Sequence, residues 1–295
     1  MQTRSTHFMH SERHFVRALA GALVGCLLLS SAGCAAPQLT ARVEESRAAN
    51  PCVRAYRSAS SAQAMMAGHN PRLLRFLASV ASGSQWTEVA AACPQRFAEG
   101  TIRAAQTQHL AHVLAPFVGG SYADPAATAH RGGLDDIARL QASADALLAA
   151  VLAEDRAGFA VEVLAARGVS NATLMLSDDH KATASRLFSL ASAVSEASPD
   201  ADGATRIKDP RQKVYSVKQL LANHNTIIDQ STGLRVPTLA AVEIDCAREE
   251  IAGASGQSSD ATHVDGLRTL SRLASSRVEQ ALNYGYPSFD DALFS

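Results

Sequence analysis

Three ionisable residues fall where two consecutive helices are expected to face each other, and their types suit proton or metal chemistry. The apolar seam of a helix expected from Leu134 onward continues onto Glu154 and Asp155, and the seam of the returning helix passes through His180. Counted back from the turn near Gly168, Asp155 and His180 lie at similar distances along the hairpin axis. We therefore expect these two side chains to be hydrogen-bonded.

A buried carboxylate beside a histidine can hold a proton, orient the imidazole or begin a metal site. The same pair can instead fix the register of two helices, and we favour this structural interpretation because buried polar groups are normally partnered without being catalytic. We accordingly assign no catalytic residue, no metal and no cofactor. The alternative is a metal site in the bundle core that uses Glu154, Asp155, His180 and His224.

Two other histidine patterns point to structure more than to ligation. His109 and His112 lie three residues apart on one expected helix, but no third ligand is identifiable near them. His224 shares an apolar stripe with Ile227 and Ile228, which is typical of a satisfied core histidine. Neither pattern changes the assignment.

The first 33 residues have the layout of a secretory signal of the lipoprotein type. Arg4, Arg13 and Arg17 precede an apolar run over residues 18–29, and small residues then lead to Cys34. A cysteine in this setting receives diacylglycerol on its thiol, so Cys34 is the expected lipidation site, with palmitate among the acyl chains.

Several alternatives to a lipid anchor at Cys34 stay open. Ser31 occupies the place where a lipobox usually has leucine, and Cys26 fits that pattern better but follows too short an apolar stretch. Cleavage after Ala36 would give a secreted protein. An uncleaved segment would be a membrane anchor, although it is shorter than the roughly 20 apolar residues of a span.

Three further cysteines, Cys52, Cys93 and Cys246, would lie outside the cytoplasm, where disulfides form. Their odd number leaves one thiol unpaired. We expect Cys52 to pair with Cys93, because both lie near helix boundaries marked by prolines. Cys246 falls on an apolar stripe, which favours a buried free thiol.

Composition favours an all-α protein without a nucleic-acid partner. The net charge is -1 and no stripe of basic residues stands out, so there is no electrostatic case for nucleic-acid binding. Alanine is abundant, aromatic residues make up 5%, and no long alternating strand pattern appears. Short links between the expected helices predict an antiparallel bundle.

The expected elements follow from apolar periodicity and from proline, glycine and capping residues. The second helix of the hairpin would be capped by Ser170 or Asn171 and end near residue 197. The expected helices cover about 51–68, a short one from Pro71, 94–116, 134–168, 171–197, 213–229, 237–252 and 260–282, with a connector over 118–133.

The hairpin also resembles a known family. The segment LLAAVLAEDRAGFAVEVLAARG, followed by DDHKATASRLFSLA, resembles the ferritin-like domain of actinobacterial lipoproteins of unknown function, with Glu154, Phe159, the turn 166–168 and His180 at matching positions. The resemblance implies a ferritin-like four-helix core within 134–290, preceded by extra N-terminal helices. Asp155 stands where the family typically has histidine, and no Glu-x-x-His occurs, which argues against a ferritin-type iron oxidase.

These observations predict an envelope lipoprotein with a signal peptide (1–33), a tether (34–50), an N-terminal helical section (51–118) and a helical bundle (134–290). It would be anchored by lipid on the extracytoplasmic face of the cell membrane, with secretion as the alternative. We expect a non-catalytic binding or interaction module whose partner is an envelope protein or a small ligand. The alternative function is a metal-binding or redox ferritin-like protein.

Overall fold

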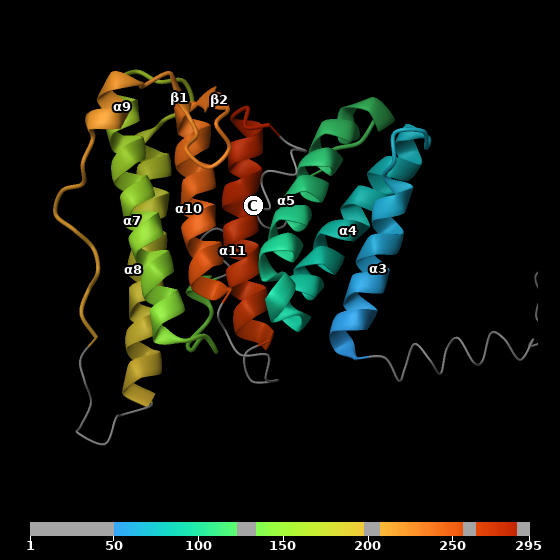
Figure 1. Cartoon of the computed structure of the whole chain (residues 1–295), viewed down its shortest axis with the longest axis horizontal. Helices are drawn as coiled ribbons and strands as arrows, with labels where there is room; N and C mark the ends of the chain where they lie inside the picture. Colours follow the sequence, from blue (N-terminus) through green and yellow to red (C-terminus); the bar gives the residue numbers. More distant parts are fainter. Residues whose placement is uncertain (1–49, 123–133, 198–206, 256–263, 288–295) are drawn as a thin grey trace, which may run out of the picture. The chain divides into compact units, whose positions relative to one another are not determined.

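A computed structural model describes residues 50–122, 134–197, 207–255 and 264–287, and it confirms the expected all-α helical bundle (Figure 1). The expected signal segment 1–33, Cys34 and the tether as far as Ala49 lie outside the described residues. The α-helices are α3 (Pro51–Met65), α4 (Arg72–Ala92), α5 (Phe97–Leu114), α7 (Ala144–Ala166), α8 (Leu174–Ala197), α9 (Lys218–Ala222), α10 (Thr238–Ala254) and α11 (Val264–Asn283). Two short 3₁₀ helices, η2 (Pro94–Arg96) and η3 (Ala115–Val118), flank α5.

From residue 50 onward the helices form one compact unit, and neighbours in Figure 1 pack against each other. Helix α7 packs on α8 and α10, α10 on α11, and α11 on α5 and α4, while α3 covers α4. One apolar core therefore runs from the N-terminal section into the bundle, and it includes Phe97 and Ile102 as well as Leu147, Leu187 and Leu270.

The N-terminal helices begin near the expected prolines, but α4 is far longer than predicted. Helix α3 starts at Pro51, and the Asn50 side chain accepts a hydrogen bond from the Cys52 amide at 2.8 Å. Helix α4 was expected to be short, yet it has 21 residues. Its residues from Ala78 to Ala91 bury one face between α3 and α5, and this packing sustains the helix despite its serines and glycine.

The α7–α8 hairpin forms as predicted, although both of its helices start later than expected. Helix α7 begins at Ala144 and not at Leu134, because the Ser143 side chain accepts a hydrogen bond from the Ala146 amide at 3.1 Å. Helix α8 begins at Leu174, where Thr173 is the capping residue in place of Ser170 or Asn171: its hydroxyl accepts from the Leu176 amide at 3.1 Å.

The prediction of one helix over 213–229 is wrong. Only α9 is helical in that range, and it is followed by strand β1 (Thr226–Ile228), which pairs antiparallel with β2 (Arg235–Pro237). The β-branched run of β1 favours an extended backbone, and a turn with Gly233 at φ 71° reverses the chain.

Asp229 fastens this strand pair to the bundle. Both Asp229 oxygens accept hydrogen bonds at 3.0 Å from Arg248 of α10, and the Tyr286 hydroxyl donates to the same carboxylate. Burial opposes ionisation of Asp229, but Arg248 and Tyr286 outweigh it and hold the pKa of Asp229 far below its usual value. The strand pair is thus tied to α10 and to the residues that follow α11.

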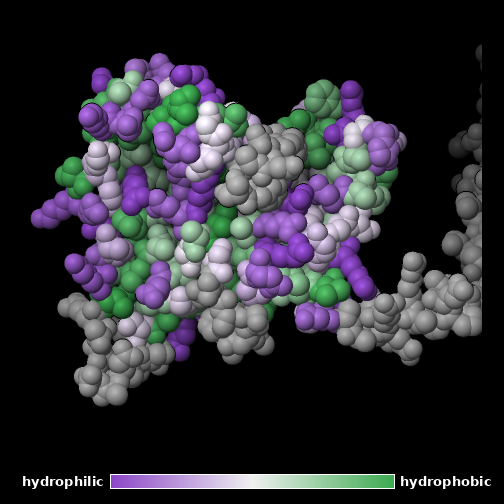
Figure 2. Space-filling view, viewed as in Figure 1, coloured by the Kyte–Doolittle hydropathy of each residue, from purple (hydrophilic) through white to green (hydrophobic). Residues whose placement is uncertain are grey.

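The surface of the described residues is mixed in character. Figure 2 shows hydrophilic side chains over much of the face in view, with apolar side chains gathered in small groups between them. Among the described residues, no helix combines the length and apolar character that crossing a membrane requires.

Candidate functional site

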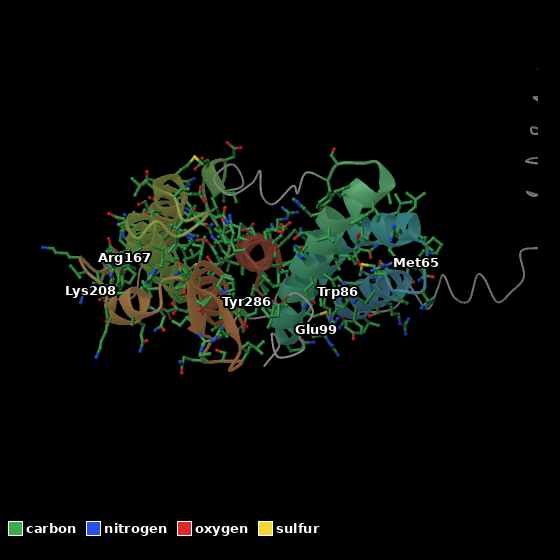
Figure 3. The ribbon with its side chains drawn as sticks, turned by 90° about the horizontal axis from the view of Figure 1, so that it is seen from above. Met65, Trp86, Glu99, Arg167, Lys208 and Tyr286 are labelled. Atoms are coloured by element: carbon green, nitrogen blue, oxygen red, sulfur yellow. A yellow bond between two sulfur atoms is a disulfide. The ribbon has the colours of Figure 1, made fainter. Side chains whose placement is uncertain are left out.

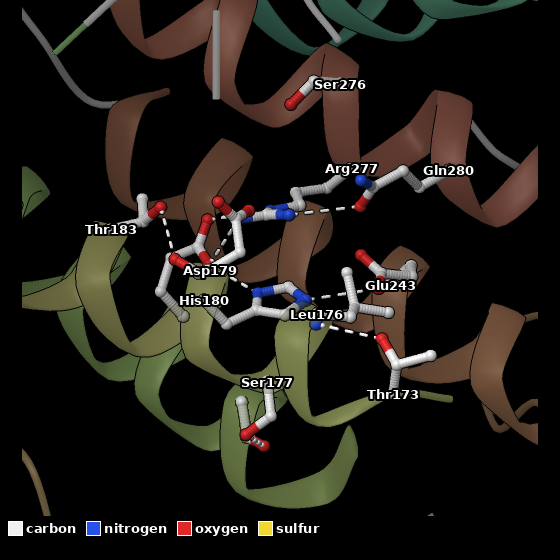
Figure 4. A network of polar contacts seen from close by, with 12 residues as sticks. Thr173, Leu176, Ser177, Asp179, His180, Thr183, Glu243, Ser276, Arg277 and Gln280 are labelled. Atoms are coloured by element: carbon white, nitrogen blue, oxygen red, sulfur yellow. Dashed lines mark hydrogen bonds and ion pairs between the residues drawn. The ribbon is translucent and has the colours of Figure 1, made fainter. Parts of the chain in front are cut away.

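Five ionisable side chains meet at the centre of the bundle, and we call them the central charge cluster; Figure 4 labels His180, Glu243 and Arg277 among them. They come from all four surrounding helices, and each is at most 3% exposed. Charged side chains are rarely buried this completely unless they are paired. The cluster consists of Glu154 of α7, His180 of α8, Glu243 and Glu250 of α10, and Arg277 of α11.

Arg277 is the fixed positive charge of the cluster. Its Nε donates to one oxygen of Glu154 and its Nη2 to the other, both at 2.9 Å, which is the paired geometry that guanidinium and carboxylate groups favour. Arg277 also donates to Gln280 at 3.1 Å and lies 3.5 Å from Asp179. Burial favours the neutral form of Glu154, but Arg277 and His180 overcome this and lower the pKa of Glu154 to about 2.

His180 bridges two of the buried carboxyl groups. Its Nδ1 lies 2.5 Å from Glu154 Oε2 and its Nε2 lies 3.2 Å from Glu243 Oε1. Burial and Arg277 disfavour the imidazolium, but Glu243 and Glu154 outweigh both and raise the pKa of His180 to about 9. At neutral pH His180 is therefore a cation that donates from both ring nitrogens, so neither nitrogen is free to act as a general base.

The α10 side of the cluster contains polar atoms without partners. One oxygen of Glu243 has no hydrogen-bond partner within the described residues, and no donor group there reaches the Glu250 carboxyl group, whose polar neighbour is the carboxyl group of Glu154. Burial, together with the nearby charge of Glu154, raises the pKa of Glu250 well above its usual value. Buried carboxyl oxygens without partners are costly, and they need an explanation in a folded protein.

Cys246 lies between these two glutamates on the same face of α10. Its ligand atom, one from Glu154 and one from His180 all lie within 4.8 Å of one another. Burial and the charge of Glu154 raise the pKa of the Cys246 thiol well above its usual value. Because the thiolate is the nucleophilic form, Cys246 is not activated for covalent catalysis in this setting.

A close approach of α7 and α8 brings His180 to Glu154. Gly158 lies one turn after Glu154, and a Cβ atom there would stand 3.0 Å from the Ser177 carbonyl oxygen and 3.1 Å from His180 Cβ. The Ser177 hydroxyl donates to the Gly158 carbonyl at 2.8 Å. The absence of a side chain at Gly158 thus lets the two helices meet beside the cluster.

The structure brings some of the sequence-predicted residues together and separates others. Glu154 and His180 are in contact, but the expected Asp155–His180 hydrogen bond is wrong: Asp155 lies one position further around α7, and it accepts from the Tyr215 hydroxyl at 2.7 Å. His224 lies in the loop between α9 and β1, outside the cluster. His109 Nδ1 contacts the Asn283 side chain at 3.0 Å.

Sequence reasoning missed Arg277 and gave Glu243 and Glu250 no role. The helical spacing of all three residues places them on the buried faces of their helices, and this signal could have identified them. Glu243 and Glu250 are seven residues apart on the face of α10 that carries Cys246, and Arg277 lies three residues after Ala274 on the buried face of α11.

A second feature, which we call the α7–α10 pocket, opens beside the cluster. It is a cavity of about 340 Å³ between α7, α10 and the segment around Tyr215, and most of its lining is apolar. Cys246 belongs both to this lining and to the edge of the cluster. Charged groups at the pocket come from Asp245 and from the ion pair of Arg156 with Glu249, while apolar surface comes from Ala153, Ala157, Phe159, Ala160, Leu220 and Val242.

Tyr215 and Ser216 form one wall of this pocket, and the segment 207–217 to which they belong lies against the helical hairpin. The Tyr215 ring packs on Phe159 of α7 with 5.6 Å between ring centroids. Arg211 donates to the Ser185 hydroxyl at 2.9 Å and lies 5.4 Å from the centre of the Phe188 ring, both on α8. This wall therefore rests on a few polar and aromatic contacts.

The N-terminal section has no such centre. Cys52 and Cys93, the two cysteines expected to pair, form a disulfide between the start of α3 and the end of α4, and Cys246 is free and buried. Figure 3 shows Trp86 among the N-terminal helices and Tyr286 beside the bundle helices.

We compared the chain with family models, with characterised proteins and with solved structures, and none of them matches it.

Proposed function

We propose that this chain is an envelope lipoprotein, exported by residues 1–33 and anchored through Cys34, whose helical bundle binds a small, mainly apolar molecule without catalysing a reaction. The observation that carries this proposal is the α7–α10 pocket. Its volume of about 340 Å³ falls in the range of ligand sites, and its lining joins apolar surface to a few charged groups.

The electrostatics of the central charge cluster support a non-catalytic role. Both ring nitrogens of His180 are engaged by carboxylates, and Glu154 is held by Arg277. A general base needs a pKa near the working pH and an accessible lone pair, and a thiol nucleophile needs a lowered pKa. Neither His180 nor Cys246 meets its requirement. The ferritin-like relationship also belongs to this proposal, supported by four helices that enclose a polar centre.

The proposed location follows from the sequence of the N-terminus. A chain anchored at Cys34 would hold the bundle near the outer surface of the cell membrane, with a short tether before Asn50. Mass analysis of the mature N-terminus tests this directly. We expect a diacylated Cys34, whereas a chain that starts at Pro37 would show the secreted form and contradict the anchor.

Ligand binding can be tested with an uncharged apolar probe, N-phenyl-1-naphthylamine, whose fluorescence rises in apolar sites. The chain with Cys34→Ser is used because it cannot be lipidated at this position and so needs no detergent, into which the probe would partition. We expect saturable binding of one probe per chain, weakened roughly tenfold or more by Val242→Phe, which fills the pocket.

Val163→Phe is the matched control, because Val163 is a half-buried valine of α7 outside the pocket lining. It should leave probe binding unchanged. The proposed ligand site would be contradicted if the Val242→Phe chain bound the probe as tightly as the chain without that change. It would also be contradicted if the chain with an unaltered pocket bound no probe.

A further inference from the structure

We propose that the central charge cluster contains a binding site for one zinc ion, with Glu154, His180, Cys246 and Glu250 as its ligands. This inference is independent of the ligand proposed for the α7–α10 pocket. It rests on three donor groups that lie close together, on the neighbouring carboxyl group of Glu250, and on the burial of all four side chains.

The first argument is the donor set. One ligand atom each from Glu154, His180 and Cys246 lies within 4.8 Å of the other two, and all three side chains are buried. Zinc binds carboxylate oxygen, imidazole nitrogen and thiolate sulfur at about 2.0–2.3 Å, usually with four ligands. Small side-chain movements would bring the three atoms to the spacing of such a site.

Glu250 supplies the fourth ligand. It lies one helical turn after Cys246 on the same face of α10, it is 3% exposed, and no donor group of the described residues reaches its carboxyl oxygens. Its carboxyl group is close enough to Glu154 to feel the charge of that residue. A cation between Glu154 and Glu250 would compensate the charge of two carboxyl groups that are otherwise buried side by side.

The remaining residues of the cluster fit supporting roles. A histidine that binds a metal usually keeps its other ring nitrogen on a carboxylate, and Glu243 holds His180 at 3.2 Å. Arg277 keeps its place as the partner of Glu154. Three buried carboxylates, one guanidinium and one Cys246 thiolate leave three negative charges, which zinc reduces to one. Zinc displaces the protons on its ligands, because metal ligands bind deprotonated.

Cobalt(II) is the direct probe, since it takes zinc sites and reports a thiolate ligand by a sulfur-to-cobalt absorption band in the near ultraviolet. We would titrate Co²⁺ and then Zn²⁺ into the Cys34→Ser chain. The expected result is one Co²⁺ per chain, a sulfur band, and loss of that band when Zn²⁺ is added. Cys246→Ser should abolish the band.

Two further variants separate a loss of zinc binding from a loss of the folded structure. Glu250→Gln preserves size and removes the carboxylate that would bind zinc, so it should fold while weakening zinc binding by roughly tenfold or more. His224→Ala, outside the cluster, should bind zinc normally. The proposal is overturned if the chain binds no zinc, if the cobalt complex lacks the sulfur band, or if Glu250→Gln binds zinc as tightly as the chain without that change.

Discussion

The N-terminal section and the bundle differ in whether the polar side chains that they bury include charged ones. In the N-terminal section the buried polar groups are neutral, and several bond within their own helix, as Thr87 does to Gly83 and Thr107 to Ala104. The bundle also buries neutral groups of this kind, as Ser276 bonds to Leu273, but it adds charged groups that join different helices, as Arg277 of α11 does with Glu154 of α7.

This difference separates two means of holding helices together. A disulfide and an aromatic core built around Trp86 join α3 to α4 and need no buried charge. The bundle instead depends on mutual compensation of charges from several helices. A charged centre is costly to bury and gives little net stability over apolar packing, but removal of one partner of a buried pair is strongly destabilising. The N-terminal section is the better candidate for a scaffold.

The largest expected effect comes from Arg277→Met, which would leave Glu154 buried without its main partner. Loss of one member of a buried ion pair costs about 3–5 kcal/mol, and we expect that decrease in the free energy of unfolding, measured with urea. Arg268→Met on the same helix is the control. Arg268 pairs with the exposed Glu88 at 2.7 Å, so its loss should cost about 0–1 kcal/mol.

Equal losses in the two arginine variants would remove the distinction between the buried cluster and an ordinary surface pair. Adding Glu154→Gln to Arg277→Met sharpens the test. The double variant should regain part of the lost stability, because the uncompensated charge is gone.

The next effect concerns the N-terminal section. Replacing Cys52 and Cys93 together by alanine removes a link between residues 41 apart in sequence. The unfolded chain then gains entropy, and we expect the free energy of unfolding to fall by about 3–4 kcal/mol. Zinc and probe binding by the bundle should not change. A loss of either binding activity would show that the scaffold and the bundle are not separable.

A smaller effect involves pH and the Asp229 network. Because folding lowers the pKa of Asp229, its contribution is fully present above the unfolded pKa of about 3.9 and is lost as pH falls toward the folded pKa. Asp229→Asn should lower stability at neutral pH by about 1–3 kcal/mol. It should also flatten the fall in stability below about pH 4. Urea unfolding at several pH values measures both, and an unchanged acid dependence would contradict the assignment.

The smallest effect is expected from Gly158→Ala. The added Cβ would meet α8 atoms at 3.0–3.1 Å, so α8 should shift slightly, with a loss of about 1 kcal/mol in unfolding free energy and weaker zinc binding. Gly68→Ala serves as the comparison, because nothing lies within 4 Å of its Cβ position. That change should be neutral or slightly stabilising. Identical behaviour of the two variants would rule out a close approach at Gly158.

Helical periodicity predicted much of the bundle and part of its centre. It identified the α7–α8 hairpin and located Glu154 and His180 on facing seams. Periodicity could not choose between Glu154 and Asp155, because neighbours differ by about 100° around a helix and the crossing of α8 decides which one faces inward. That crossing depends on the contact of Gly158 with Ser177, which spacing within one helix does not reveal.

Other features depend on partners far away in sequence. Arg277 is buried because it meets Glu154, which is 123 positions earlier, and an isolated arginine normally indicates a solvent-facing side. Strand β1 is a similar case. Its three β-branched residues also fit the end of an apolar helix pattern, but their hydrogen bonds to β2 make the segment a strand. The omission of Arg277 and the helix predicted in place of β1 have the same cause, because in each case tertiary contacts outweigh the local preference of the sequence.

Cys246 has one further consequence, because the same side chain borders both proposed binding sites. Zinc would hold its sulfur from the cluster side, and a molecule in the α7–α10 pocket would touch it from the other side. Linkage then requires reciprocity: whatever factor zinc imposes on the affinity for the pocket ligand, the ligand imposes on the affinity for zinc. The affinity of the bundle for the pocket ligand would then depend on the concentration of zinc, and its affinity for zinc on the concentration of the ligand.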